Sequence, residues 1–313
     1  MINYEKLSRN PSIFRNFTGL TVPEFNALYS EIDRQYPEYN EKRLHRPDRK
    51  RDIGAGHPFK HALRERLLML LMYNRLYVTS SLLGFLFDLG QTNVLKNIRK
   101  LEPLVRETLP LPGKIHKAAQ RLGTLEEVEE LFPGFKAFLD ATEQEIPRPG
   151  NKAKRRTHYS GKKKRHTVKT QITVNTLGVI MHKAPHARGS RHDYSLYNWR
   201  HPRLPGEVCL GLDLGYDGVQ NDYPELKVMV PFKRRSPGRG KRGVKAKELT
   251  CEEKAYNVAL SKERAVVEHA ISRLKKFRIM AYVFRNRLRH YETVTDIVCG
   301  LVNLRILGTS ALT

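Results

Sequence analysis

Cysteine is scarce in this chain: only Cys209, Cys251 and Cys299 occur among its 313 residues. No two of them form a Cys-x-x-Cys pair, which argues against a structural zinc site with the usual ligand spacing. A sparse, odd set of cysteines is typical of a reducing compartment and not of a secreted scaffold held by disulfides.

Long apolar runs are missing as well. The longest, at residues 67–73 and 82–87, fall far short of the roughly 20 residues that a membrane-spanning helix needs. The first residues, Met-Ile-Asn-Tyr-Glu-Lys, lack the apolar core of a signal peptide. We therefore expect a cytoplasmic protein with no membrane partner. Its hydrophobic fraction of 40% predicts a globular fold.

Acidic residues are the third shortage. The chain has 32 Asp and Glu against 57 Lys and Arg, a net charge of +25, and no acid occurs between residues 145 and 193 or between 225 and 248. Ten Lys or Arg fall within 148–169 and eight within 233–247. This excess favours a polyanionic partner, so we predict phosphate-backbone contacts with steep salt dependence. The second basic run is broken by Gly and Pro and is predicted to be a mobile loop.

Four regions follow one another along the chain. We expect a helical segment with a charged arm at 1–55 (the arm a loop at 41–52), a helical domain at 56–112, a connector at 113–134 and a second domain at 135–313. In the second domain, strands are predicted at 135–146, 166–175, 178–187, 207–214 and 226–232, and helices at 251–278 and 293–307. The fold class is therefore α+β or α/β, with helices packed on a mixed sheet.

The helical domain contains two helices joined by a short turn at Gly90. They are predicted at 80–89 and 91–102. The second helix has one apolar face, formed by Val94, Leu95, Ile98 and Leu101. Its outer face carries Asn93, Lys96, Asn97 and Lys100. This arrangement is typical of a helix-turn-helix, and we predict that the outer face binds duplex DNA; an ordinary helical hairpin is the alternative.

Three acidic residues occupy positions where they could act in catalysis. Asp140 lies in the first predicted strand, Asp213 ends a later one, and Glu268 lies on the long helix. Phosphodiester cleavage needs an activated water or hydroxyl and neutralised charge, and two Mg²⁺ ions supply both through hard oxygen ligands. We predict that the three carboxylates hold such a two-metal site, with Arg264 and Lys275 meeting phosphate. The alternative for Glu268 is a surface ion pair with Arg264.

Five motifs in the second domain now allow a resemblance to be stated. They are DATE at 140–143, YSGKKKRHTVKTQ at 159–171, ARGSRHDYSLY at 187–197, DLGYDG at 213–218 and RAVVEHAISRLKKF at 264–277. With FRNFTGLTVPEF at 14–25 and the helix-turn-helix segment 60–105, the chain resembles the DDE transposases of insertion sequences in the group around insertion sequence five, and more distantly the Harbinger transposases.

The resemblance implies an RNase H-like catalytic core at 135–313 behind the DNA-binding helix-turn-helix domain at 56–112. By motif, Asp140, Asp213 and Glu268 would be the metal-binding triad, using Mg²⁺, which Mn²⁺ could replace. Contacts to the DNA backbone would come from the basic motif through Tyr159, Lys162, Lys163, Lys164, Arg165 and His166. Asp193 is the alternative to Asp213, because Leu214 stands where a polar residue is common in the family; Asp217 is a weaker one.

The function implied is DNA transposition in a bacterial or archaeal cytoplasm, at the nucleoid. Such an enzyme cleaves at the terminal inverted repeats and transfers the 3′-OH end into target DNA by in-line attack. It would work as a homodimer or larger assembly on paired ends. Two alternatives stay open: a catalytically inactive DNA-binding protein derived from a transposase, and a Mg²⁺-dependent nuclease without strand transfer.

Overall fold

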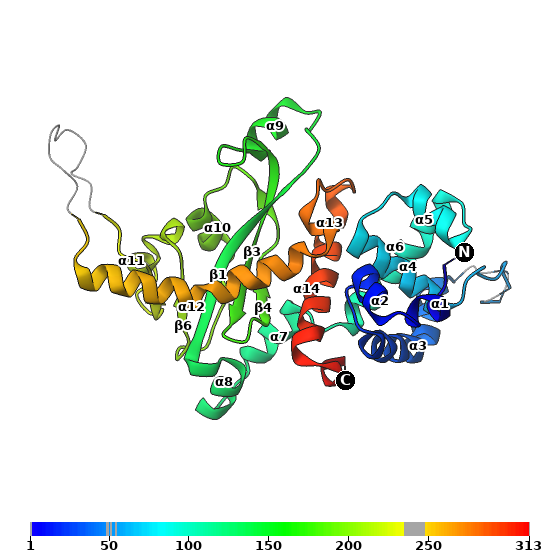
Figure 1. The fold of residues 1–313 in the computed structure, drawn as a ribbon, viewed down its shortest axis with the longest axis horizontal. Coiled ribbons are helices and arrows are strands. Elements are labelled where there is room, and N and C mark those ends of the chain that lie inside the picture. Colours follow the sequence, from blue (N-terminus) through cyan, green and yellow to red (C-terminus); the bar gives the residue numbers. More distant parts are fainter. Residues whose placement is uncertain (1, 48–49, 51, 54, 235–247, 313) are drawn as a thin grey trace. The chain divides into compact units, whose positions relative to one another are not determined.

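A computed structural model of the chain describes residues 2–47, 50, 52–53, 55–234 and 248–312. It packs as two compact units, one formed by Met1–Leu111 with Arg273–Thr313 and the other by Pro112–Ser272 (Figure 1). Most of the basic run expected as a mobile loop, residues 235–247, lies outside the described residues.

In its described residues, the first unit contains helices and no strands. Its helices are α1 (Tyr4–Ser8), α2 (Pro11–Thr18), α3 (Val22–Leu44), α4 (Leu63–Leu76), α5 (Ser80–Phe87), α6 (Gln91–Thr108), α13 (Arg278–Ala281) and α14 (Tyr291–Leu307), with short 3-10 turns at Leu288–His290 and Thr309–Leu312. α3 begins with a capping box, in which Thr21 and Glu24 bond each other's backbone N–H groups. It runs to Leu44 through Pro37, so the prediction of a loop from residue 41 was wrong for its first four residues.

A tight turn joins α5 to α6. Asp88 caps α5 in the left-handed conformation (φ 51°), which Asp tolerates better than most residues. A Cβ added at Gly84 would lie 2.4 Å from the carbonyl oxygen of Leu89. Only a glycine therefore lets the turn fold back against α5, and this packing fixes the direction in which α6 begins.

The last helices of the chain pack within this first unit. Arg106 on α6 forms a 2.7 Å ion pair with Asp296 on α14, and a Cβ at Gly300 of α14 would meet Leu109 at 2.7 Å. The sequence pattern groups residues 273–313 with the second domain. The functional domain boundaries stay a prediction, but these residues pack among the N-terminal helices.

The second unit begins with two helices, α7 (Pro112–Ala119) and α8 (Leu125–Leu131), and a 3-10 turn at Pro133–Phe135. The expected connector is therefore partly helical. α8 begins with a second capping box, formed by Thr124 and Glu127. This local helix signal was overlooked in the sequence because the segment is rich in Gly, Pro and charged residues.

A mixed sheet forms the centre of the second unit. Its strands are β1 (Lys136–Glu145), β2 (Tyr159–Ser160), β3 (Arg165–Asn175), β4 (Ile180–Lys183), β5 (Ala187–Arg188), β6 (Cys209–Gly211) and β7 (Val228–Met229). They lie in the order β2-β3-β1-β6-β7, with β4 and β5 also paired to β3. β1 is antiparallel to β3 but parallel to β6, and β6 is parallel to β7. This mixed sheet confirms the predicted fold class, including its RNase H-like character.

Several strands are shorter than predicted. The strand expected at 178–187 is divided into β4 and β5 around Pro185, which has no N–H to donate. β6 and β7 each cover only the middle of the predicted range.

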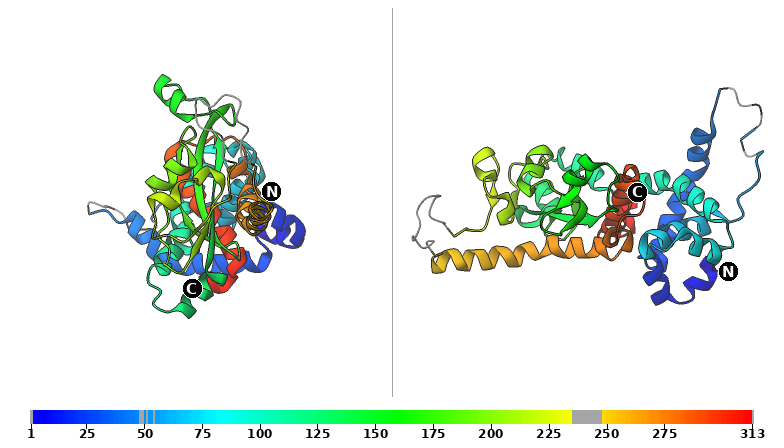
Figure 2. Two further views of the ribbon diagram at one scale, coloured as in Figure 1. Left: turned by 90° about the vertical axis from the view of Figure 1, so that its left-hand side faces the viewer. Right: turned by 90° about the horizontal axis from the view of Figure 1, so that it is seen from above.

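Helices complete the second unit: α9 (Lys152–His158), α10 (Asp193–Trp199), α11 (Val219–Asp222) and α12 (Cys251–Lys275), with a 3-10 turn at Leu214–Tyr216. The last three residues of α12 belong to the first unit. α12 extends along one face of the sheet (Figures 1 and 2). Within the described residues, no helix has the length and apolar content required to cross a membrane.

Candidate active site

Two aspartates lie at the same level of neighbouring parallel strands, Asp140 within β1 and Asp213 just beyond the end of β6. The register of β1 with β6 pairs Phe138 with Gly211, and Asp140 and Asp213 each follow two residues later. A Cβ at Gly211 would meet the Phe138 ring at 2.5 Å, so this glycine permits the close approach of the strands. Because adjacent strands lie about 4.8 Å apart, the register brings the two carboxylates together.

The electrostatics of Asp140 agree with this placement. Burial is the main cause that raises its pKa to about 6; the charges of Asp213 and Asp193 also act to raise it, and Arg264 acts to lower it. Its Oδ1 accepts a hydrogen bond of 2.7 Å from the N–H of Ala141, which lowers the pKa. A carboxylate whose neighbours repel its charge is a good ligand for a cation.

Asp213 and Asp193 converge on Gly215. A Cβ there would lie 2.9 Å from Oδ1 of Asp213 and 3.4 Å from Oδ2 of Asp193. Oδ1 of Asp213 accepts a hydrogen bond of 2.7 Å from the N–H of Gly215, at the start of the 3-10 turn. Both aspartates that the sequence offered as alternatives therefore lie beside Asp140.

A buried lysine distinguishes them. Nζ of Lys169, on β3, lies 2.8 Å from Oδ1 of Asp193 and donates a second bond of 2.8 Å to the carbonyl of Arg191. Glu143 lies 3.8 Å from the same ammonium. Asp193 is thus paired with a cation, so its charge is less available to a metal than that of Asp213. The other alternative, Asp217, is exposed and lies 3.9 Å from Lys233.

Tyr216 closes the buried side of the site. Its ring is fully buried and its hydroxyl donates a hydrogen bond of 3.4 Å to Gln171. Burial, followed by the charges of Asp193, Asp140 and Asp213, raises its pKa well above the ordinary value. The phenol therefore stays neutral, and its apolar ring keeps water from the sheet side of the carboxylates.

α12 contributes Arg264 and, one turn later, Glu268. Arg264 is half-buried, its charge acts on Asp140 and Tyr216, and its Nε is buried without a hydrogen-bond partner. Glu268 is exposed. Spacing of four residues puts both on one side of the helix, but Glu268 does not join the buried charges. Lys275, at the end of the helix, is exposed.

The chemistry of these residues fits a divalent cation. Asp140 and Asp213 supply hard oxygen ligands and repel each other, a repulsion that a cation would relieve. In the part of the chain that the structure describes, no three His, Cys, Asp or Glu side chains converge as a metal cluster. Two of the predicted ligands are thus together, and the third is not.

The predicted DNA-contacting residues of the basic motif lie at the tip of β2 and β3. Tyr159 is 43% exposed. Its ring packs edge-to-face with the ring of His166, and the two ring centroids lie 5.6 Å apart. Lys162, Lys163 and Lys164 are exposed in the turn between the strands. Arg165 is also exposed, but it forms a 2.8 Å ion pair with Glu145. The tip therefore presents mostly unneutralised charge.

The outer face of α6 is less uniform than the sequence suggested. Asn93 and Lys96 are exposed. The amide oxygen of Asn97 instead accepts a hydrogen bond of 2.8 Å from the buried Arg66. Lys100 is half-buried over the Phe59 ring, and burial followed by nearby cations lowers its pKa. Only part of this face is therefore free to meet a ligand.

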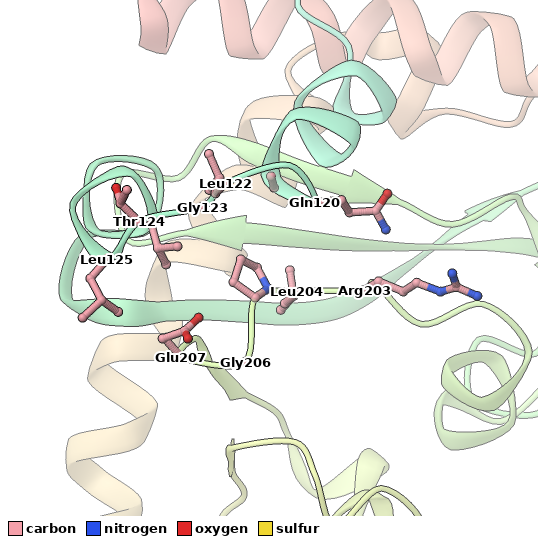
Figure 3. A pocket seen from close by; sticks show the side chains of 12 residues that line it. Gln120, Leu122, Gly123, Thr124, Leu125, Arg203, Leu204, Gly206 and Glu207 are labelled. Carbon is pink, nitrogen blue, oxygen red and sulfur yellow. The ribbon is translucent and has the colours of Figure 1, made fainter.

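One further hollow lies elsewhere in the second unit. It has a volume of about 420 Å³ and lies between the segment from Ala119 to Val128 and the loop from Arg203 to Glu207 (Figure 3). Its lining contains none of the clustered aspartates.

Sequence reasoning missed three residues of the site: Lys169, Tyr216 and Gln171. Lys169 and Gln171 belong to the YSGKKKRHTVKTQ motif and Tyr216 to DLGYDG, so their motifs were a signal. Their roles depend on which strand faces the aspartates, and that is a property of the fold.

Comparison with known proteins gives consistent matches. The family described as "DDE superfamily endonuclease" matches residues 139–303, and that described as "Helix-turn-helix of DDE superfamily endonuclease" matches residues 62–111. A protein of Microchaete diplosiphon, "Probable transposase for insertion sequence element IS702", is 26% identical over 295 residues, covering 94% of each chain. No solved structure matches the chain significantly.

Proposed function

Because the chain belongs to the DDE superfamily endonucleases, we propose that it is the transposase of an insertion sequence. The observation that carries this proposal is the approach of Asp140 on β1 and Asp213, just beyond the end of the adjacent strand β6, inside that family match. The similarity to the probable transposase over nearly the whole chain supports it.

In this proposal Asp140, Asp213 and Glu268 hold divalent metal, with Mg²⁺ as the resident ion and a two-metal arrangement. Bound metal would activate a water or 3′-OH and neutralise charge developing on the phosphate. Glu268 is exposed in this structure, so it would have to turn toward the two aspartates, and its position on the same side of α12 as Arg264 allows this.

The chain's own residues prepare the site for an anionic substrate. Arg264 carries an unpartnered buried Nε beside Asp140, where it is placed to meet a phosphate oxygen. Lys169 holds Asp193 and the backbone of Arg191, which fixes the loop above the site. Tyr216 excludes water from the buried side. The same groups would serve both steps, cleavage at the terminal repeats and transfer of the 3′-OH to target DNA.

DNA binding is proposed for three surfaces. The exposed part of α6 (Asn93 and Lys96, with Asn97 and Lys100 behind them) would read or position the terminal repeat. The tip of β2 and β3 and the exposed Lys275 would contact the phosphate backbone. A homodimer or larger assembly on paired ends remains part of the proposal.

A cleavage and strand-transfer assay tests this function. Labelled duplexes carrying the DNA that flanks the gene would be incubated with Mg²⁺ and wild-type protein, Asp140→Asn, Glu268→Gln or the control Asp217→Asn. We expect nicks at a defined end and joined products from the wild type and the control. Both acid-site variants should lose the products while binding DNA at least as tightly.

The competing function is a DNA-binding protein that has lost catalysis, and the exposed position of Glu268 favours it. It predicts tight, salt-sensitive binding without cleavage by any variant in Mg²⁺ or Mn²⁺. Nicks without joined products would instead identify a nuclease that does not transfer strands.

A further inference from the structure

Five arginines of the first unit form a cluster to which both ends of the chain contribute. They come from α2, α4, the last turn of α12, α13 and α14. The members of this arginine cluster are Arg15, Arg75, Arg273, Arg278 and Arg305. In the part of the chain that the structure describes, none of them forms an ion pair with a carboxylate. The cluster therefore concentrates five permanent positive charges without internal neutralisation.

Arg75 connects the elements that carry the cluster. Its Nε donates a hydrogen bond of 3.3 Å to the carbonyl of Asn16, the residue after Arg15. Its guanidinium carbon lies 5.2 Å from the centroid of the Phe277 ring, and Arg278 follows Phe277 in the chain. Contacts of Arg75 thus place α4 against the segments that carry two other members of the cluster.

Gly19 permits this close packing. It ends α2 in the left-handed conformation, with φ of 84°. A Cβ added there would lie 2.6 Å from Cζ of Phe277 and 3.5 Å from Cδ of Arg75. Any other residue would be strained at this φ and would push the ring away, so the fold holds the arginines together by design of the backbone.

Electrostatic repulsion acts within the cluster. Burial lowers the pKa of Arg75, and the charges of three other members, Arg305, Arg278 and Arg15, also act to lower this pKa. Burial likewise lowers the pKa of Arg305, and the charges of Arg15 and Arg273 act in the same direction. Arginine does not lose its proton in proteins, so only a counter-charge can relieve the repulsion.

Some guanidinium donors of the cluster have no partner. The Nη1 atoms of Arg75 and Arg273 are buried without a hydrogen bond. Glu24 is a carboxylate whose charge acts on Arg305, but its Oε2 already accepts a bond of 2.7 Å from the N–H of Thr21. Buried donors without acceptors cost free energy, and an anion with several oxygens, bound to the guanidinium groups, would offset that cost.

From these observations we propose that the arginine cluster is a binding site for phosphate groups. Arg15 and Arg278 are exposed and the other three members are half-buried, so an anion can enter from solvent and be held from several sides. The planar fork of a guanidinium matches pairs of phosphate oxygens. The phosphates belong either to a DNA backbone or to a free polyphosphate. The site is independent of the proposed function, since none of its members serves the carboxylates or the three DNA-binding surfaces.

Thermal unfolding of the full-length protein tests the site, with sodium tripolyphosphate as the probe. Sodium chloride at equal ionic strength is the reference. A ligand that binds only the folded state stabilises it, so we expect the Tm to be roughly 5 °C higher in tripolyphosphate than in chloride. Arg305→Gln should lose about half of this gain or more, and the remainder measures the other basic surfaces. Arg15→Gln, a substitution of an exposed residue, should lose a smaller part.

A matched variant separates the site from general loss of charge. Arg43, on α3, is another half-buried arginine of the same unit, and its Nη2 donates a bond of 2.7 Å to Asn40. Arg43→Gln should keep the full gain in Tm. Without added anion, Arg305→Gln should be at least as stable as the wild type, because a like charge has been removed. A purely structural role of Arg305 would instead lower the Tm in chloride.

Duplex DNA distinguishes the two sources of phosphate. The affinity for a labelled duplex would be measured by anisotropy, with EDTA present, between low and physiological salt. If the DNA backbone occupies the cluster, Arg305→Gln reduces the slope of affinity against salt by about 1. An unchanged slope, together with a lost tripolyphosphate gain, assigns the site to a free polyphosphate. Either result supports a phosphate site.

Two results would overturn the inference. One is an equal Tm in tripolyphosphate and in chloride of the same ionic strength. The other is an equal gain for Arg305→Gln and Arg43→Gln. Neither result bears on cleavage at the carboxylates, and absence of cleavage with the gain intact would contradict the proposed function alone.

Discussion

At the scale of single residues, Lys169 shows how little a run of charge says about each member. It lies at the end of the basic stretch 148–169, where the sequence predicts phosphate contact. In the structure it is 7% exposed and neutralises Asp193. Sequence analysis identified the aspartates from their motifs, but not which cation faces them, because that depends on the pairing of β3 with β1 and β5.

Lys169→Met tests this internal role. It leaves Asp193 without its cation and the Arg191 carbonyl without its donor, so we expect a loss of about 2 kcal/mol in the free energy of unfolding, measured in urea. The exposed Lys162→Met should cost less than about 0.5 kcal/mol. Adding Asp193→Asn to the Lys169 variant should restore part of the loss; no recovery would mean that the pair is unimportant.

His182, on β4, gives a pH dependence. Burial, with help from the charges of His116, Lys183 and His201, lowers its pKa to about 3. In the unfolded chain the histidine has a pKa near 6.5. Below that pH the unfolded chain therefore binds a proton at His182 that the folded state does not bind. Stability is therefore complete above about pH 6.5 and falls as the pH drops toward 3, by at most about 1.4 kcal/mol per pH unit.

The comparison with His182→Gln isolates this residue. The difference in unfolding free energy between wild type and variant, measured by urea titration at several pH values, should change through that window and be constant above it. A difference that is constant down to pH 4 would contradict the role assigned to His182.

At the scale of elements, long segments with strong periodicity were predictable and short ones were not. β1, β3, α12 and α14 lie within a few residues of their predicted bounds, because burial on a regular face leaves a clear pattern. α7 and α8 were missed, since each has only seven or eight residues and few apolar ones. The parallel pairing of β1 with β6, which creates the site, joins segments some seventy residues apart and leaves no local mark.

The turn between α5 and α6 is an element whose packing can be broken selectively. Gly84→Ala places a methyl group against the Leu89 carbonyl at 2.4 Å, so the turn must open. We expect a loss of roughly 2 kcal/mol in unfolding free energy and weaker duplex binding. Gly90→Ala is the control, because nothing lies within 4 Å of its added Cβ. Equal behaviour of the two variants, in urea unfolding and anisotropy, would contradict this account.

At the scale of the whole molecule, the charge of +25 governs binding to any polyanion. If DNA is the partner, the logarithm of the affinity should fall linearly with the logarithm of the salt concentration, by about 0.9 per neutralised phosphate. Lys163→Ala, at the exposed tip of β2 and β3, should reduce that slope by about 1. Lys117→Ala, exposed on α7, should leave it unchanged, as measured by anisotropy between low and physiological salt.

The first unit is discontinuous in the chain: residues 112–272 are inserted between its two parts. On a ribosome, α4 to α6 emerge early, but α14, which carries the partners of Arg106 and Leu109, is made last. At roughly 5–20 residues per second, the insert delays completion of the helical core by about 10–30 s. A nascent chain or a fragment ending near residue 272 would therefore lack a finished helix-turn-helix unit, so assembly of that unit is linked to synthesis of the whole catalytic segment.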